Sequence, residues 1–302
     1  MEDQKELFDT KVEEKGVSFG DPSFEGNKSR PIHRWVPWIA GFSSEFVRGI
    51  VETDLDSKGV VLDPFAGVGT TLVESAIIGH DVVGFEINPY AELACRVKLE
   101  ASAIDLDKLR AEVGQFTQFY LSKVSNGYTP DSTPPEGFRT RGEFYAPKVE
   151  RKVLLFWDYV TDMEEGAIRD LFRIAFAAEM IRFSNYSYEP SLGTRKAAGK
   201  PRIEDYAVGE ALREKLANIA DDVEWVQNDT DAEKADAQLH QTSFFNCEEY
   251  LEQGAADLVI TSPPYVNNYH YIRNTRPHLY WMGFADTPKD YKPLEHKNYG
   301  KY

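Results

Sequence analysis

The residues of this 302-residue chain that most directly suggest chemistry lie at 257–265, with the sequence DLVITSPPY. Residues 257–260 form a short apolar run ending in two β-branched side chains, and this pattern predicts a buried strand of a parallel sheet. Thr261 and Ser262 then turn the chain, and the double proline at 263–264 prevents further strand pairing because proline has no N–H. Ligands of open α/β sheets bind just beyond the carboxyl ends of the strands. The loop is therefore predicted to border a binding site.

The polar groups of this loop suit the activation of an exocyclic amine. Such a nitrogen is a poor nucleophile because its lone pair is delocalised into the ring, and two acceptors aimed at its hydrogens free the lone pair as the new bond forms. Ser262 offers a hydroxyl oxygen, and Pro263 offers a carbonyl oxygen that the adjoining Pro264 holds in place. Tyr265 offers a flat ring on which an extruded base can stack. These four residues are the predicted catalytic set; the competing interpretation is a tight turn after a core strand.

Composition sets limits on the class of protein. With 42% hydrophobic residues, the chain can form one large or two modest domains. Its two cysteines, Cys95 and Cys247, show no metal-site spacing, and we expect no metal. There is no signal peptide and no long apolar run, which predicts a cytoplasmic protein, nucleoid-associated if it acts on DNA. The net charge of −16 counts against a nucleic-acid partner unless positive charge is concentrated locally.

A second block, residues 59–88, predicts a binding site for a nucleoside-containing cofactor. A strand at 60–62 leads into the turn DPFAGVGTT at 63–71, and a helix follows from Leu72 to Ile78. Glycines let a backbone approach a ligand closely, and the free N–H groups at a helix start favour polar or anionic atoms. A second strand at 81–85 ends at Glu86, roughly 20 residues beyond the turn, where an acid suits the hydroxyls of a ribose. The turn is neither G-x-G-x-x-G nor a Walker loop, so dinucleotide and triphosphate sites are disfavoured.

The rest of the chain is predicted to be mostly helical. Residues 1–30 are a polar, mobile arm, and a Ser-capped amphipathic helix begins near Ser44. Further helices are predicted at 89–99, 105–124, 149–160, 166–183 and 205–226, with loops at 125–148 and 195–202 and a third strand at 239–243. We assign a core to residues 31–100 and 236–302. Residues 101–235 are predicted to be a helical insertion and a candidate target-recognition region.

The motifs DPFAGVGTT, FEINPY and TSPPY, in this order at predicted strand ends, resemble those of the DNA amino-methyltransferases. These enzymes use S-adenosyl-L-methionine to methylate cytosine N4 or adenine N6 of a flipped base in double-stranded DNA. The resemblance covers most of the chain outside the arm and the insertion. It implies an α/β fold, a Rossmann-like class I methyltransferase sheet in which the strands present have the order 3-2-1-4.

The resemblance also implies which residues bind the cofactor. The glycine turn would hold the methionine part, Glu86 with Ile87 the ribose, and the residues after strand three the adenine. The segment before the first strand would contribute further contacts. The residues carried over in this way are His33, Trp35, Phe42, Asp63, Phe65, Ala66, Gly67, Gly69, Thr70, Glu86, Ile87, Ser243 and Phe244. Ser243 departs from the family, in which an acid often occupies this position.

The methylated atom is left open by the motif. In this family S-P-P-Y goes more often with cytosine N4, which we favour, although a Ser hydroxyl and an Asp carboxylate can fill the same acceptor position. Adenine N6 is the first alternative. An RNA methyltransferase acting on a guanine amine, a protein-glutamine methyltransferase and a catalytically incomplete cofactor-binding subunit are the others. The expected reaction is a direct in-line displacement that needs no cysteine nucleophile.

Two basic clusters are candidates for binding DNA. Arg195, Lys196 and Lys200 lie in a glycine-flanked segment, while Arg273 and Arg276 follow the predicted catalytic loop. The competing interpretation of the first cluster is a solvated loop. The second, being so near the predicted base pocket, is favoured for phosphate contacts.

The family's sheet has seven strands, of which three follow strand four. No convincing strand follows Tyr265 in this sequence, so strand four is expected to be an exposed apolar edge. On this basis we expect a truncated or split methyltransferase whose sheet is completed by a second polypeptide or a dimer partner.

Overall fold

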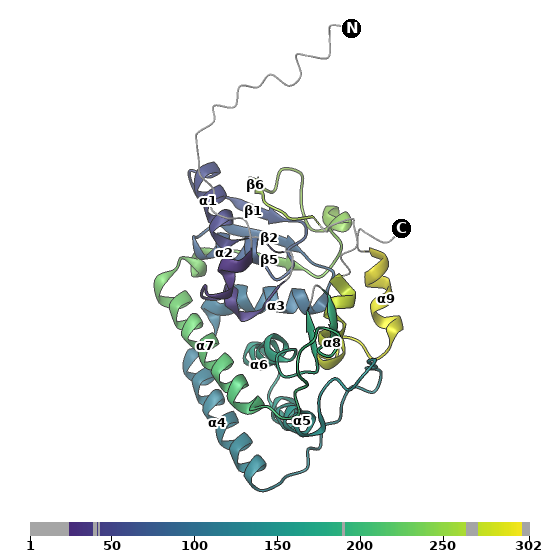
Figure 1. The fold of residues 1–302 in the computed structure, drawn as a ribbon. Helices are drawn as coiled ribbons and strands as arrows, with labels where there is room; N and C mark the ends of the chain where they lie inside the picture. The colour runs from purple at the N-terminus through teal and green to yellow at the C-terminus, as the bar shows by residue number, and fades with distance from the viewer. Residues whose placement is uncertain (1–23, 39–40, 42, 189–190, 264–270, 298–302) are drawn as a thin grey trace.

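The computed structural model describes residues 24–38, 41, 43–188, 191–263 and 271–297 (Figure 1). Among the predicted site residues, Phe42, Pro264 and Tyr265 lie outside the described part of the chain. The strands are β1 (Val60–Asp63), β2 (Asp81–Phe85), β3 (Tyr186–Tyr188), β4 (Leu192–Thr194), β5 (Ala237–His240) and β6 (Leu258–Val259). The α-helices are α1 (Ser44–Asp54), α2 (Thr70–Ile77), α3 (Pro89–Leu99), α4 (Leu106–Ser125), α5 (Pro147–Asp162), α6 (Ala167–Glu179), α7 (Val208–Asp229), α8 (Tyr271–Trp281) and α9 (Pro288–Lys297). Short 3-10 helices occupy Phe24–Lys28, His33–Trp35, Glu100–Ala103, Ala232–Lys234 and Phe244–Glu249.

The central sheet has four parallel strands in the order β5-β2-β1-β6. This is the predicted order 3-2-1-4, and it confirms the α/β, Rossmann-like fold class. The strand pairing runs from Val60 opposite Asp81 to Asp63 opposite Gly84, so that β1 and β2 end at the same edge of the sheet. The loops after both strands therefore meet.

The two faces of the sheet are buried by different parts of the chain. Val61 and Val82 pack against the side chains of α1 and α2. Successive residues of a strand point to opposite faces, so Leu62 and Val83 face the other way and pack against the segment 244–256. The valine and leucine residues that predicted strands here thus fill both faces of a parallel sheet, as such sheets require.

The strand before the predicted catalytic loop is less buried than its sequence predicts. It is only two residues long, and although Ile260 directly after it is buried, the side chain of Val259 is 54% exposed. Val259 lies on the same face of the sheet as Leu62 and Val83. The segment 244–256 buries this face at β1 and β2 but does not extend over β6. Within the described residues β6 has a neighbour on one side alone, so the expectation of an exposed apolar edge agrees with the structure.

The segment 101–235 supplies α4 to α7, which pack around a core rich in phenylalanine. Figure 1 shows α4 and α7 running side by side away from the sheet. The same core includes residues of α3 and α8, so these helices join the segment to the sheet. Within this segment β3 and β4 form an antiparallel hairpin that was not predicted from the sequence. Each of these strands has three residues, too few for an alternating pattern to be recognised.

The described part of the predicted mobile arm, residues 24–30, is attached to the protein through Asn27. Asn27 is fully buried, and its side-chain oxygen accepts a hydrogen bond from the backbone N–H of Ser44 at 2.9 Å, at the start of α1. None of the helices in the described ranges combines the length and the apolar character that crossing a bilayer would demand.

Candidate functional site

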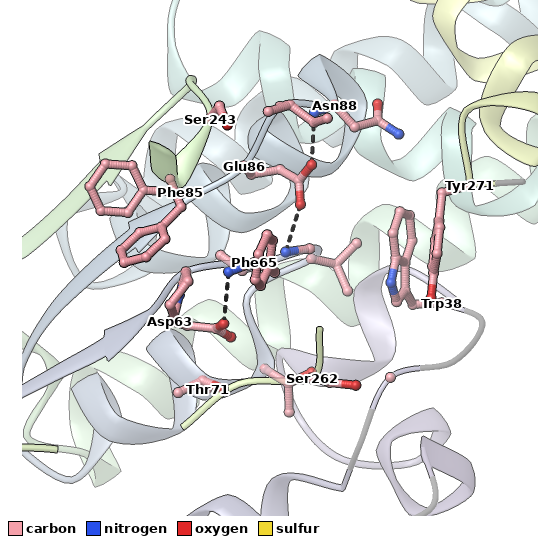
Figure 2. Close-up of a pocket in the computed structure, with 18 of the residues that line it drawn as sticks. Trp38, Asp63, Phe65, Thr71, Phe85, Glu86, Asn88, Ser243, Ser262 and Tyr271 are labelled. Carbon is pink, nitrogen blue, oxygen red and sulfur yellow. Dashed lines mark hydrogen bonds between the residues drawn. The ribbon is translucent and has the colours of Figure 1, made fainter. Parts of the chain in front are cut away.

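A pocket lies at the carboxyl ends of the parallel strands, where the loops after β1, β2, β5 and β6 converge (Figure 2). Ten of the predicted site residues line it: Asp63, Phe65, Ala66, Gly67, Thr70, Glu86, Ile87, Ser243, Phe244 and Ser262. The glycine turn and the serine of the S-P-P-Y loop, almost 200 residues apart in the sequence, therefore share one cavity. This is the geometry that a methyl donor and an amine acceptor would need.

The glycine turn adopts a backbone that few other residues tolerate. Gly67 has φ 54° and Gly69 has φ 85°, both in the left-handed region. A Cβ added to Gly67 would lie 3.4 Å from Nε1 of Trp38, which packs over the turn. A Cβ added to Gly69 would lie 2.5 Å from Sγ of Cys95. Gly69 therefore lets α3 pack closely behind the turn and, unlike Gly67, does not line the pocket.

Glu86 joins the glycine turn to the start of α3 (Figure 2). One carboxylate oxygen accepts a hydrogen bond from the N–H of Gly67 at 2.8 Å, and the other accepts one from the N–H of Asn88 at 2.7 Å. Burial raises the pKa of Glu86 to about 7, and these hydrogen bonds oppose the rise. Because each carboxylate oxygen can accept more than one hydrogen bond, Glu86 retains acceptor capacity for the hydroxyls of a ligand.

Asp63 connects the glycine turn to the loop that contains Ser262. Its Oδ1 accepts hydrogen bonds from the N–H of Phe65 at 3.0 Å and from the hydroxyl of Thr261 at 2.8 Å. Burial raises the pKa of Asp63 to about 6 against the effect of these bonds. A second link runs from the hydroxyl of Thr71 to the carbonyl of Ile260 at 3.4 Å. The two halves of the pocket are thus held together by side chains of the DPFAGVGTT motif.

Phenylalanine rings from β2 and from the loops after β1 and β5 form an apolar part of the lining. The rings of Phe85 and Phe244 meet edge to face with centroids 5.5 Å apart, and Phe65 lies 6.4 Å from Phe244. The hydroxyl of Ser243 accepts a hydrogen bond from the N–H of Phe245 at 3.4 Å and caps the short helix that follows. The three rings offer apolar surface to a flat aromatic ring of a ligand.

Sequence reasoning missed the wall that contains Trp38 and Tyr271, which Figure 2 shows together at one end of the pocket. Tyr271 begins α8, and α8 is held there by a hydrogen bond of 3.0 Å from the Asn88 amide to the hydroxyl of Thr275. The other lining residues that were not predicted are Gly41, Pro64, Val68, Thr71, Phe85, Asn88, Thr242, Phe245 and Ile272. A signal for Trp38 did exist, because the segment before the first strand was expected to contact cofactor.

Comparison with known proteins agrees with this geometry. Residues 11–96 match the family model for N6 and N4 methyltransferases, described as DNA methylase. The type II methyltransferase M.BsoBI of Geobacillus stearothermophilus is 27% identical over 285 residues, which cover 86% of this chain and 54% of the relative. M.AvaI of a Nostoc species is 24% identical, covering 87% of the chain and 56% of the relative.

The chain is thus similar to the DNA amino-methyltransferases over residues 11–96 and to type II methyltransferases over most of its length. M.MvaI of Kocuria varians, a further type II methyltransferase, is 25% identical over 79% of the chain and 54% of its own length. The chain thus spans about half the length of these curated relatives.

Two residues expected to contact cofactor lie outside the pocket. His33 and Trp35 are buried and do not line the pocket. The ring Nε2 of His33 lies 2.8 Å from a carboxylate oxygen of Glu74 on α2, and the indole N–H of Trp35 donates to Asp222 on α7 at 2.9 Å. Their 3-10 turn directs both side chains into the interior, so the segment reaches the pocket through Trp38 instead.

The basic clusters predicted to bind DNA lie on two elements that touch. The Tyr188 hydroxyl of the β3-β4 hairpin donates to the carbonyl of Asn274 on α8 at 2.9 Å, and the N–H of Leu192 donates to the Asn274 side chain at 3.4 Å. The hairpin leads into Arg195, Lys196 and Lys200, while Arg273 and Arg276 belong to α8, whose first two residues line the pocket. Lys196, Lys200 and Arg273 are exposed; Arg195 and Arg276 are half-buried.

Proposed function

We propose that this chain forms the cofactor- and amine-binding part of a site-specific DNA methyltransferase that uses S-adenosyl-L-methionine. The favoured acceptor is the exocyclic N4 of a flipped cytosine. The observation that carries the proposal is the shared pocket, in which Ser262 meets the glycine turn and Glu86. The type II methyltransferases among the relatives support DNA as the substrate.

The lining of the pocket fits the proposed cofactor. Glu86 has acceptor capacity for ribose hydroxyls, and Phe65, Phe244 and Ile87 offer apolar surface to an adenine. Trp38 and the backbone of the turn around Gly67 would bind the methionine end. When bound, S-adenosyl-L-methionine supplies an electrophilic methyl group on a sulfonium sulfur.

The protein's contribution to the reaction is positioning and hydrogen bonding. The Ser262 hydroxyl and the Pro263 carbonyl accept hydrogen bonds from the amine, which frees the nitrogen lone pair to form the new N–C bond. As this bond forms, the sulfur–methyl bond of the donor would break with its electron pair left on sulfur, and one amine proton would pass to solvent. A cysteine nucleophile is not required, and Cys95 is unsuited to that role because burial raises the pKa of its thiol.

The charge distribution supports a DNA partner despite the net charge of −16. Residues 136–143, 191–204 and 271–276 contain eight Arg and Lys residues but three Glu. These segments are joined: a guanidinium nitrogen of Arg276 donates to the carbonyl of Arg139 at 3.1 Å, and the guanidinium of Arg202 forms an ion pair with Glu143. Such a local surplus of cations beside the pocket is what phosphate contacts need.

Nucleoside analysis by mass spectrometry tests the proposal. The chain is incubated with duplex DNA and S-adenosyl-L-methionine carrying a labelled methyl group, and the digested DNA is searched for labelled nucleosides. Labelled N4-methylcytosine is expected. Labelled N6-methyladenine would keep the reaction but correct its target, and cofactor binding without transfer to any DNA would favour the incomplete-subunit alternative.

A further inference from the structure

A buried carboxylate in the helical segment, that of Asp222, forms hydrogen bonds that have no part in the proposed reaction. Asp222 on α7 is 2% exposed. Its two oxygens accept four hydrogen bonds from one short stretch of chain: from the N–H of Ile32 at 2.8 Å, from two guanidinium nitrogens of Arg34 at 3.0 and 2.6 Å, and from the indole N–H of Trp35 at 2.9 Å. A single side chain of α7 therefore fixes residues 32–35.

This stretch has a backbone conformation that needs support. Ile32 has φ 60°, and within the described ranges it is the one non-glycine residue with a positive φ. The left-handed region is costly for a β-branched side chain, and Asp222 accepts the N–H of this same residue. A second contact from α7 holds the turn, since the Lys215 ammonium donates to the carbonyl of Arg34 at 2.8 Å. On the opposite side His33 contacts Glu74 of α2 at 2.8 Å.

The turn leads directly to the wall of the pocket. Trp38, three residues beyond Trp35, packs over Gly67 and lies 6.3 Å from the ring of Tyr90. A shift of the turn would move the Trp38 indole relative to Gly67. Removing the Asp222 carboxylate would leave the Arg34 charge and the Trp35 N–H without their acceptor, and a buried polar group left unpaired is costly.

We infer that Asp222 is a positioning residue for the cofactor pocket and acts through the 32–35 turn on Trp38. The inference rests on the proposed function in that the ligand is S-adenosyl-L-methionine. It gives α7 a role in cofactor binding that is separate from target recognition.

The test compares Asp222→Ala and the nearly isosteric Asp222→Asn with two controls on the same helix. Asp221→Asn makes the same charge change at an exposed neighbour, and Val226→Ala removes buried apolar volume without touching the turn. Calorimetry measures the Kd for S-adenosyl-L-methionine at a temperature at which every variant is folded. Acrylamide quenching of tryptophan fluorescence is measured for each variant with and without the additional substitution Trp38→Phe. The difference between the two measurements reports the exposure of Trp38.

Both Asp222 variants are expected to raise the Kd at least tenfold and to make Trp38 more accessible to acrylamide. Asp221→Asn and Val226→Ala should leave the Kd within about twofold, since neither touches the turn. Wild-type affinity and quenching in folded Asp222→Asn would overturn the inference, as would an equal loss of affinity in Val226→Ala. If the wild type fails to bind the cofactor, the proposed function fails instead, and the quenching comparison still decides whether Asp222 positions Trp38.

Discussion

Ser262 is the side chain to which we assign contact with the reacting amine, so its removal should affect the chemical step and spare the binding of cofactor. Ser262→Ala is expected to lower the single-turnover rate of methyl transfer about 100-fold, the effect typical of losing one preorganised hydrogen-bonding group. Its Kd for S-adenosyl-L-methionine should stay within about twofold of the wild-type value. Wild-type turnover in this variant would exclude the assigned role.

Glu86 predicts a pH dependence of cofactor binding. Its pKa of about 7 lies above the ordinary value of 4.5 because the carboxyl group is buried. Ribose hydroxyls donate to the ionised form, so bound cofactor should lower this pKa, and binding should release a proton near neutral pH. The Kd is expected to fall as the pH rises from 6 to 8 and then to level off.

Glu86→Gln provides the control for that titration. The amide cannot ionise, so the variant should bind cofactor more weakly and with a Kd that changes little between pH 6.5 and 8. Calorimetric titrations at several pH values, in buffers with different ionisation enthalpies, measure both the affinity and the protons released. An unaltered pH profile in Glu86→Gln would assign the titration to another group.

At the scale of elements, the decisive contact is the hydrogen bond between the Thr261 hydroxyl after β6 and Asp63 after β1. Thr261→Val keeps the volume but removes the donor, so Ser262 should lose its fixed position beside the glycine turn. We expect a roughly tenfold lower rate of methyl transfer and a higher pKa of Asp63, because this bond lowers it. Thr261→Ser should restore both, and equal loss in the two variants would attribute the effect to packing.

Much of the sheet and of the cofactor half of the pocket could be predicted because it is encoded locally. The predicted strand at 81–85 and helix at 89–99 have the observed bounds, and Glu86 directly follows β2. The third strand begins two residues earlier than predicted, at Ala237, because Ala237 and Gln238 are exposed on an edge strand and lack the large apolar side chains that indicate a strand. A local sequence pattern does not show how far a strand at the edge of a sheet extends or how exposed its side chains are. The exposure of Val259 in β6 could not be predicted for the same reason.

The features that sequence reasoning missed depend on contacts between distant segments. Trp38 reaches the pocket because Asp222, more than 180 residues away, holds the preceding turn. Tyr271 reaches it because α8 packs on α3 through Asn88. The choice among His33, Trp35 and Trp38 as the pocket residue follows from the direction of one 3-10 turn, which no spacing pattern in the sequence specifies.

At the scale of the whole molecule, we expect DNA to approach the surface formed by the β3-β4 hairpin, α8 and residues 136–143. The double variant Arg195→Glu with Lys196→Glu should weaken binding of a DNA duplex and reduce the dependence of log Kd on log salt, because fewer counterions are released. Its affinity for S-adenosyl-L-methionine should not change. Fluorescence anisotropy with labelled duplex at several salt concentrations provides the measurement.

A matched charge reversal controls for the net charge. Lys108→Glu with Arg213→Glu alters exposed residues of α4 and α7 by the same four units of charge. It should lower the affinity for DNA less than the hairpin variant. Equal losses from the two double variants would remove the hairpin from the DNA-binding surface.

The completing polypeptide expected at the edge of β6 stays a prediction. Sedimentation of the chain at several concentrations tests for self-association through this edge. A compact monomer that binds cofactor with full affinity would argue against a need for completion, whereas a dimer that Val259→Lys dissociates would support pairing at β6.

The most direct test of the central claim, that the glycine turn and Ser262 share one methyl-donor pocket, is a calorimetric titration of the folded chain with S-adenosyl-L-methionine. Saturable one-to-one binding is expected for the wild-type chain and for Ser262→Ala, and no binding is expected for Glu86→Ala. Absence of binding to the folded wild-type chain, or binding unaffected by Glu86→Ala, would contradict the central claim.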